Sequence, residues 1–173
     1  MPNDNEMQKP KAPIQLKHWR APGDHPYADL TRTWLKEGNV DPAGAEKESD
    51  DHIYWNTSAG DGMSIVVAIY KDKNEEMFFK IEAAISQMNK KVEAQVTKWL
   101  AQTNANLYFP FRLALMENDG IIVQCRSYCD GFTPEHFKLR LETLIPFATN
   151  IQNELKMKFG LPSYIQESLN IPA

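Results

Sequence analysis

The stretch LYFPFRLALMENDGIIVQCRSY, residues 107–128, decides the fold because it holds two alternating runs on either side of a turn. The positions of the first run that share one phase are Leu107, Phe109, Phe111, Leu113 and Leu115. In the second run Ile121, Val123, Cys125 and Ser127 alternate with Ile122, Gln124, Arg126 and Tyr128. A period of two is typical of strands that bury one face and expose the other.

The turn between the two runs is Asn118-Asp119-Gly120, and its Asp-Gly pair suits the positive φ angles of a tight hairpin. Residues 107–128 therefore predict an antiparallel hairpin. Pro110 has no amide hydrogen to donate to a neighbouring strand, so we place it at an edge or a bulge.

A long helix is predicted directly after the hairpin. Thr133-Pro134-Glu135 supplies a capping side chain, a proline at the first helical position and an acid that the helix dipole favours. Apolar residues then recur every three or four positions, at Phe137, Leu141, Leu144, Ala148, Ile151, Leu155 and Phe159. Gly160 and Pro162 end the helix, and Pro146 should bend it.

The segments before the hairpin follow the same logic. Ser86 is the predicted cap of a helix whose apolar stripe is Met88, Val92, Val96, Trp99 and Leu100. Strands are predicted at 63–70, which reads as well buried, at 77–85, and in a shorter piece at 53–55. A first helix begins at Pro26 and ends before Gly38.

The element order is thus α-β-β-β-α-β-β-α, which predicts an α+β fold: an antiparallel five-stranded sheet with helices packed on one face. A chain of 173 residues suits one domain, which we place at residues 26–160. Residues 1–25 hold four prolines and are expected to form an extended arm, and residues 161–173 a C-terminal tail.

Composition narrows the function. A net charge of -4 argues against non-specific nucleic-acid binding, which needs a dense basic surface. No apolar run approaches the roughly 18 residues of a membrane span, and no charged-then-apolar leader opens the chain, so we expect a cytoplasmic protein.

Residues that could carry chemistry lack partners in the sequence. Cys125 and Cys129 would lie about 13 Å apart on one strand, too far for a disulfide, and no spaced histidines complete a metal site around them. The four histidines are scattered, and no catalytic motif is present. The acidic segment 37–61 is interpreted as a solvated connector or a contact for a basic partner. We expect no enzyme activity, no metal and no cofactor.

The order of elements resembles that of the YbjN-type proteins, which share the fold of type III secretion chaperones. The resemblance rests on the helix at 88–100, the junction Thr103-Asn104-Ala105-Asn106, the hairpin at 107–128, and Gly131-Phe132-Thr133-Pro134-Glu135 before the last helix. It implies a module that binds a partner polypeptide without turnover, frequently as a homodimer.

A sheet covered by helices on one side leaves its other face available to a partner. Aromatic and arginine side chains contribute most at such interfaces. The candidate partner-binding residues on that face are Phe78, Tyr108, Arg112, Gln124, Arg126 and Tyr128. Each of them could equally be an ordinary half-exposed strand residue.

The N-terminal arm offers two further candidates, Leu16 and Trp19, in a polar background that suits docking; a tail without function is the alternative. The leading hypothesis is a protein-binding adaptor or chaperone-like module. The alternative is a structural subunit or assembly factor that docks into a larger complex through its arm. A small enzyme with an unrecognised site is a third hypothesis.

Overall fold

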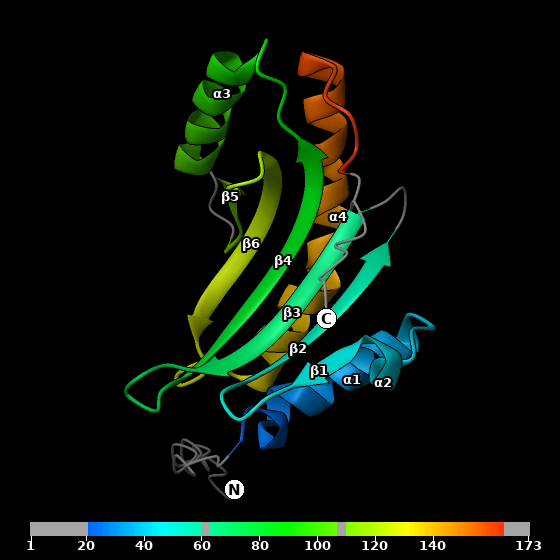
Figure 1. Cartoon of the computed structure of the whole chain (residues 1–173), viewed down its shortest axis with the longest axis vertical. Coiled ribbons are helices and arrows are strands. Elements are labelled where there is room, and N and C mark those ends of the chain that lie inside the picture. The colour runs from blue at the N-terminus through cyan, green and yellow to red at the C-terminus, as the bar shows by residue number, and fades with distance from the viewer. Residues whose placement is uncertain (1–20, 60–62, 107–109, 165–173) are drawn as a thin grey trace, which may run out of the picture.

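The computed structural model describes residues 21–59, 63–106 and 110–164. Its elements are η1 (Pro22–Asp24), α1 (Pro26–Glu37), α2 (Pro42–Ala45), β1 (Glu46–Glu48), β2 (His52–Ala59), β3 (Met63–Lys71), β4 (Met77–Gln87), α3 (Glu93–Asn106), β5 (Arg112–Leu115), β6 (Gly120–Tyr128) and α4 (Pro134–Phe159). The strands form one antiparallel sheet in the order β1-β2-β3-β4-β6-β5 (Figure 1). The predicted α+β class is confirmed, with six strands in place of five.

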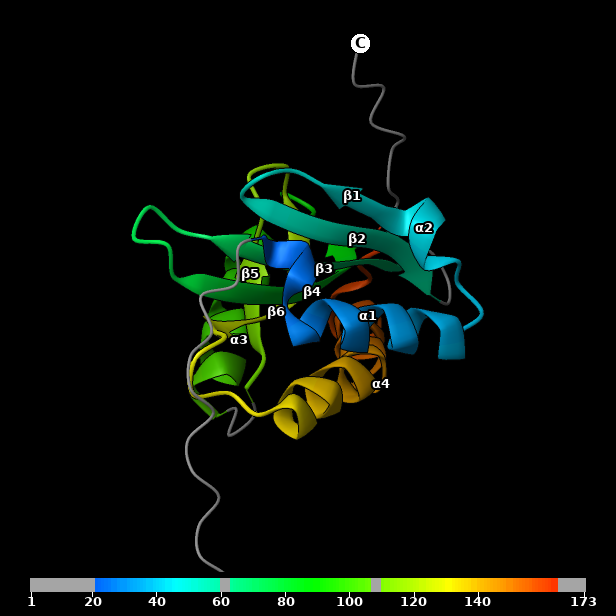
Figure 2. The ribbon, with the colours of Figure 1, turned by 90° about the horizontal axis from the view of Figure 1, so that it is seen from below.

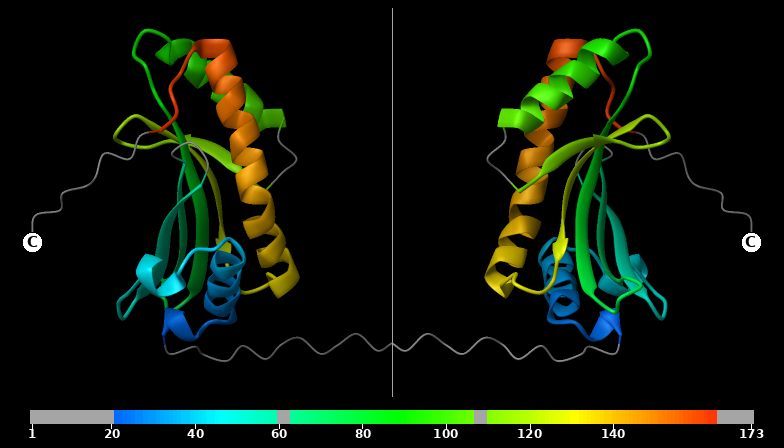
Figure 3. Two further views of the ribbon diagram at one scale, coloured as in Figure 1. Left: turned by 90° about the vertical axis from the view of Figure 1, so that its right-hand side faces the viewer. Right: turned by 90° about the vertical axis from the view of Figure 1, so that its left-hand side faces the viewer.

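The helices and the sheet form two layers. α1 and α4 lie against the same face of the sheet (Figure 2), and α3 lies at one end of the sheet next to β5 (Figure 3). No helix in the described part of the chain is both long enough and apolar enough to cross a membrane.

The core lies between the sheet and α4. Phe137, Leu141 and Leu144 of α4 are fully buried, as the apolar stripe predicted. Tyr27 of α1 stacks on Phe137 with 4.3 Å between ring centroids, and its hydroxyl donates a hydrogen bond to the backbone oxygen of Phe132. The end of α1 that begins at Pro26 is thereby attached to the chain just before α4.

The boundaries of α4 follow the capping rules. The side chain of Thr133 accepts a hydrogen bond from the amide of His136 at 3.2 Å. At the other end Gly160 adopts φ 66°, a left-handed conformation that glycine takes without the steric cost of a Cβ atom. Pro146 lies within the helix, as predicted.

The prediction that Ser86 caps a helix is wrong. Ser86 lies in β4 and is 1% exposed, and its hydroxyl donates to the backbone oxygen of Pro162 at 2.6 Å. It also forms an antiparallel bridge with Ser163. The Ser86 hydroxyl is therefore bonded to Pro162 instead of capping a helix, and α3 begins only at Glu93.

The prediction of a solvated connector at 37–61 is also wrong. This segment contains α2, β1 and β2, and β1 is the additional sixth strand. Glu46 explains the error, because its carboxylate is not simply hydrated: it accepts hydrogen bonds from Trp55 Nε1 at 2.8 Å and from Arg32 Nε at 2.9 Å. An acid inside a short edge strand resembles a loop residue in the sequence.

The hairpin is confirmed between β5 and β6, with a shorter first strand than predicted. Phe111 and Leu113 are buried, but Leu115 is 43% exposed, and residues 107–109 lie outside the described part of the chain. Asp119 rather than Gly120 takes the positive φ, at 61°. β5 lies at the edge of the sheet, and Pro110 precedes it without interrupting a ladder.

Segments on both sides of the 26–160 core also pack on it. Pro22 and His25 are buried beside α1. At the other end Leu161 is buried, and the amide of Tyr164 donates to the oxygen of Ile85 at 3.2 Å.

Candidate partner-binding surface

The strand alternation sends one set of side chains away from α1 and α4, and we call the surface that they form the open face. Strand register arranges this face in rows that cross the sheet. The first row is His52, Tyr70, Phe78 and Tyr128, the second is Tyr54, Ala68, Lys80 and Arg126, and the third is Asn56, Val66, Glu82, Gln124 and Arg112.

Three rings of the first row, Tyr70, Phe78 and Tyr128, form what we call the aromatic row. Tyr70 and Phe78 stack with 5.5 Å between ring centroids, and the ring centroids of Phe78 and Tyr128 are 4.0 Å apart. Tyr128 is 50% exposed. Rings packed against one another in this way offer a rigid apolar surface, so little conformational entropy is lost when a partner covers them.

Arg126 joins the aromatic row to the second row. Its guanidinium carbon lies 5.4 Å from the ring centroid of Tyr70 and 5.8 Å from that of Phe78, within the range of cation–π attraction. Partial burial raises the pKa of Tyr70, and Arg126 opposes that rise, so the tyrosine stays a neutral hydroxyl at physiological pH.

The open face is more basic than the chain as a whole. Lys47 pairs opposite Tyr54 and so shares this face with Lys80, Arg112 and Arg126. The acid in these rows is Glu82, whose Oε1 forms an ion pair with Lys80 Nζ at 2.9 Å. A local excess of positive charge on a protein of net charge -4 favours an acidic partner segment.

The structure brings five of the predicted site residues together, since Phe78, Arg112, Gln124, Arg126 and Tyr128 all lie on the open face. Tyr108, Leu16 and Trp19 lie outside the described residues. Whether any of these side chains contacts a partner remains a prediction.

Sequence reasoning missed Tyr70, which lies at one end of the aromatic row, beside Phe78. The apolar, β-branched run 63–70 predicts a well-buried strand, without distinguishing its two faces. Val66 and Tyr70 are only half-buried in β3, whereas Ile65, Val67 and Ile69 are buried, so the strand does have two faces. The tyrosine at an even position next to a charged turn was the signal that could have revealed it.

Both thiols and His25 are buried. Cys125 and Cys129 are free and buried thiols, and burial raises the pKa of both, that of Cys129 to about 12. His25 accepts a hydrogen bond from the amide of Tyr27, and burial lowers its pKa to about 4. Within residues 21–59, 63–106 and 110–164, no cluster of three metal-ligating side chains occurs.

Replacing Cys125 with Ala and Cys129 with Ser together should leave the bound-metal content unchanged. Both thiols are held protonated by burial, whereas a metal ligand must be a thiolate. We expect a loss of about 1–3 kcal/mol in the free energy of unfolding from the lost packing. Elemental analysis of both proteins checks this, and stoichiometric zinc that disappears in the variant would contradict it.

No protein-family model matches the chain, and no curated protein does either. Solved structures do match. A chain of the ExsC–ExsE complex superimposes with a TM-score of 0.50 at 13% identity, over 72% of this chain and 90% of that one. At this identity the likeness shows the fold alone.

Two further structures have lower scores. YbjN from E. coli, described as a putative transcription regulator, matches with a TM-score of 0.48 and 17% identity over 78% of this chain and 93% of that one. A chain of the ExoU–SpcU complex from the type III secretion system of Pseudomonas aeruginosa matches with a TM-score of 0.45 and 13% identity, over 70% and 93%. The fold expected from the resemblance is the fold that this chain shares with the matched chain of the ExsC–ExsE complex.

Proposed function

We propose that this chain is a non-enzymatic, protein-binding adaptor or chaperone-like module that holds a partner polypeptide on its open face. The observation that carries the proposal is the aromatic row with Arg126 beside it, at the ends of β3 and β6 and the start of β4, on the sheet face that α1 and α4 leave uncovered. Tyrosine and arginine are the residues most enriched at interface hot spots.

The charge of the open face narrows the partner. The rows of this face contain Lys80, Arg112 and Arg126, with Lys47 opposite Tyr54, against the single acid Glu82, so its formal charge is positive. A polypeptide segment with acidic residues between apolar anchors would match the basic rows and the aromatic row together. The matched chain, which has a similar fold, comes from the ExsC–ExsE complex, and a role in binding another protein is consistent with that.

The setting that fits this role is the cytoplasm, with the chain acting alone or as a homodimer and with no turnover of a substrate. Cys125, Cys129 and His25 are buried. The exposed His52 contacts both Ser49 Oγ, at 2.7 Å, and Asp51 Oδ1, at 2.8 Å, through the same ring nitrogen, Nδ1, whereas a catalytic histidine uses one ring nitrogen for the serine and the other for the acid. Binding energy rather than chemistry is what this surface can supply.

The test is the combined substitution of Arg126→Ala and Tyr128→Ala, with partners first identified by affinity capture from the native cytosol. We expect complex formation to weaken by at least about 2 kcal/mol, or about 30-fold in Kd, which is the scale of interface hot spots. The melting temperature should stay nearly unchanged because both side chains are exposed. Titration calorimetry and thermal unfolding measure the two quantities.

The matched control is Lys156→Ala with Met157→Ala, a cation and an apolar side chain exposed on α4, outside the open face. This pair should not change Kd. Deletion of residues 1–25 distinguishes binding through the open face from the alternative of an assembly factor that docks through its N-terminal arm. A subunit held by its arm would lose its complex on truncation. Binding that survives the double substitution but not the truncation would overturn the open-face proposal. An oligonucleotide that binds the open face with a lower Kd than the captured polypeptide partner would also overturn it.

A further inference from the structure

The helix-facing side of β2 becomes less covered toward the end of the strand. Ile53 and Trp55 on this side are fully buried, but Thr57 and Ala59, at the next two inward positions, are only half-buried. α1 ends at Glu37, and the chain turns away through Gly38 and on to Val40. A corner of the inner sheet face is thereby left between α1, α4 and the ends of β2 and β3.

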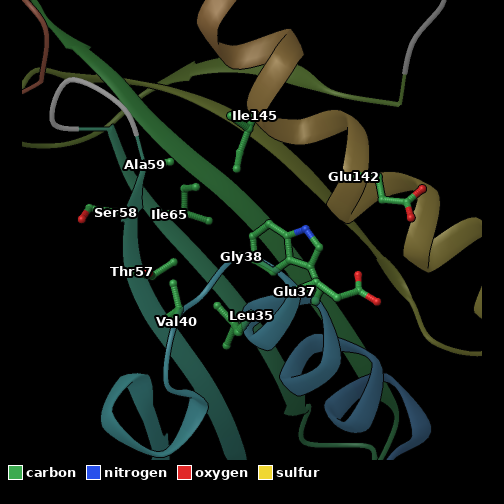
Figure 4. Close-up of a pocket in the computed structure, with 11 residues that line it drawn as sticks. Leu35, Glu37, Gly38, Val40, Thr57, Ser58, Ala59, Ile65, Glu142 and Ile145 are labelled. Carbon is green, nitrogen blue, oxygen red and sulfur yellow. The ribbon is translucent and has the colours of Figure 1, made fainter.

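That corner is a pocket of about 370 Å³, shown in Figure 4. Apolar side chains from four places in the chain form its walls: Leu35, Val40, Ala59, Ile65 and Ile145. Trp34, Gly38, Thr57 and Ser58 complete the lining together with two acids. The volume falls at the lower end of the range for small-molecule sites, roughly 300–1,000 Å³, and apolar walls with a few polar groups are typical of them.

The two acids give the pocket a negative charge. Glu37 comes from α1 and Glu142 from α4, and they lie on the same side of the pocket (Figure 4). Glu37 is also the last residue of α1, where the helix dipole is negative. Trp34, one of the lining residues, adds an indole ring, the aromatic group that attracts cations most strongly.

Basic residues near the rim only partly offset this charge. Lys138 reaches Glu142 at 3.6 Å, but both side chains are about half exposed, so the pair is weak and leaves carboxylate oxygen available. Lys36 precedes Glu37 and is exposed at the end of the helix. The two carboxylates would repel an anionic ligand, whereas a cationic ligand would gain an electrostatic attraction that a neutral ligand lacks.

We propose that this pocket binds a small amphipathic amine, with an aliphatic chain against the apolar walls and a primary ammonium group beside Glu37 and Glu142. The site lies on the helix side of the sheet, whereas the partner-binding surface proposed above is the open face. The two proposals therefore stand or fall separately.

The probes are n-hexylammonium and its neutral counterpart n-hexanol, titrated into the full chain. Binding is followed on the indole N–H resonance of Trp34, assigned with a Trp34→Phe variant. We expect hexylammonium to bind about five- to tenfold more tightly than hexanol, as two partly exposed carboxylates would provide. Glu37→Gln combined with Glu142→Gln should remove this preference, while Glu154→Gln, farther along α4, should retain it.

Two further variants test the walls and the rim. Ala59→Leu should fill the pocket and abolish the binding of both probes, and Lys138→Ala should tighten hexylammonium about twofold by freeing Glu142. Equal affinities for the two probes, or a preference that persists in the double Gln variant, would overturn the proposal. So would probe-induced shifts that map to the aromatic row instead of Trp34. The Gln variants change only exposed side chains, so they decide the matter even if Ala59→Leu fails to fold.

Discussion

Leu141→Asp is expected to remove most or all of the folded state. Leu141 is fully buried on α4, so the variant loses its apolar contacts and places a carboxylate where no partner can reach it. The combined cost should exceed about 5 kcal/mol, which is comparable with the whole stability of a typical domain, about 5–15 kcal/mol. Urea denaturation followed by circular dichroism measures the loss.

The same substitution two residues earlier is the matched control. Leu139 lies on the same helix and is 45% exposed, so Leu139→Asp should change the free energy of unfolding by less than about 1 kcal/mol. A folded Leu141→Asp protein with an unchanged melting temperature would contradict the packing of α4. Equal losses at the two positions would contradict it as well.

Glu46→Ala should cost about 2–4 kcal/mol in the free energy of unfolding, a large effect for a residue of a three-residue edge strand. Its carboxylate accepts two hydrogen bonds from Arg32, from Nε at 2.9 Å and from Nη2 at 3.0 Å. It accepts a third from Trp55 Nε1 at 2.8 Å. Trp55 is fully buried, so the substitution leaves its donor unpaired. Chemical denaturation checks the value, and Glu48→Ala, exposed on the same strand, should be nearly neutral.

The contribution of Glu46 should also depend on pH. The hydrogen bond from Arg32, more than any other interaction, lowers the pKa of Glu46 below its usual value of 4.5. A group whose pKa is lower in the folded state stabilises the protein above the unfolded pKa and loses that effect as the pH falls through the folded pKa. The stability difference between wild type and Glu46→Gln should therefore be constant above about pH 5.5 and shrink below pH 4.5. A difference that grows on acidification would contradict this assignment.

Elements with local signals could be predicted from sequence, and those that depend on distant partners could not. The cap at Thr133, the stripe of α4 and the terminating Gly160 are all local, and the structure has each of them. Ser86 has the same local chemistry as a cap, but its hydroxyl binds Pro162, 76 residues away. β1 was missed because Glu46 is acidic and its partners, Arg32 and Trp55, lie in other elements.

The candidate surface shows the same division. The phase of β6 places Gln124, Arg126 and Tyr128 on one face, and strand register places Phe78 of β4, also predicted for that face, opposite Tyr128. The position of Tyr70 next to a charged turn indicates exposure, but its place beside Phe78 depends on the pairing of β3 with β4, which the run 63–70 does not specify. The acidic pocket was beyond prediction because Glu37 and Glu142 are separated by more than a hundred positions in the chain.

The contact between Tyr27 and Phe132 bears on how the molecule opens. It joins the first long helix to the residues that lead into the last one, across 105 positions, while Ser86 holds Pro162 at the other end of α4. The N-terminal end of α1 and the segments flanking both ends of α4 are therefore anchored to parts of the chain far away in sequence. The amide hydrogens of α1 and α4 should exchange with solvent only through a concerted opening of both helices, which makes this pair one cooperative unit.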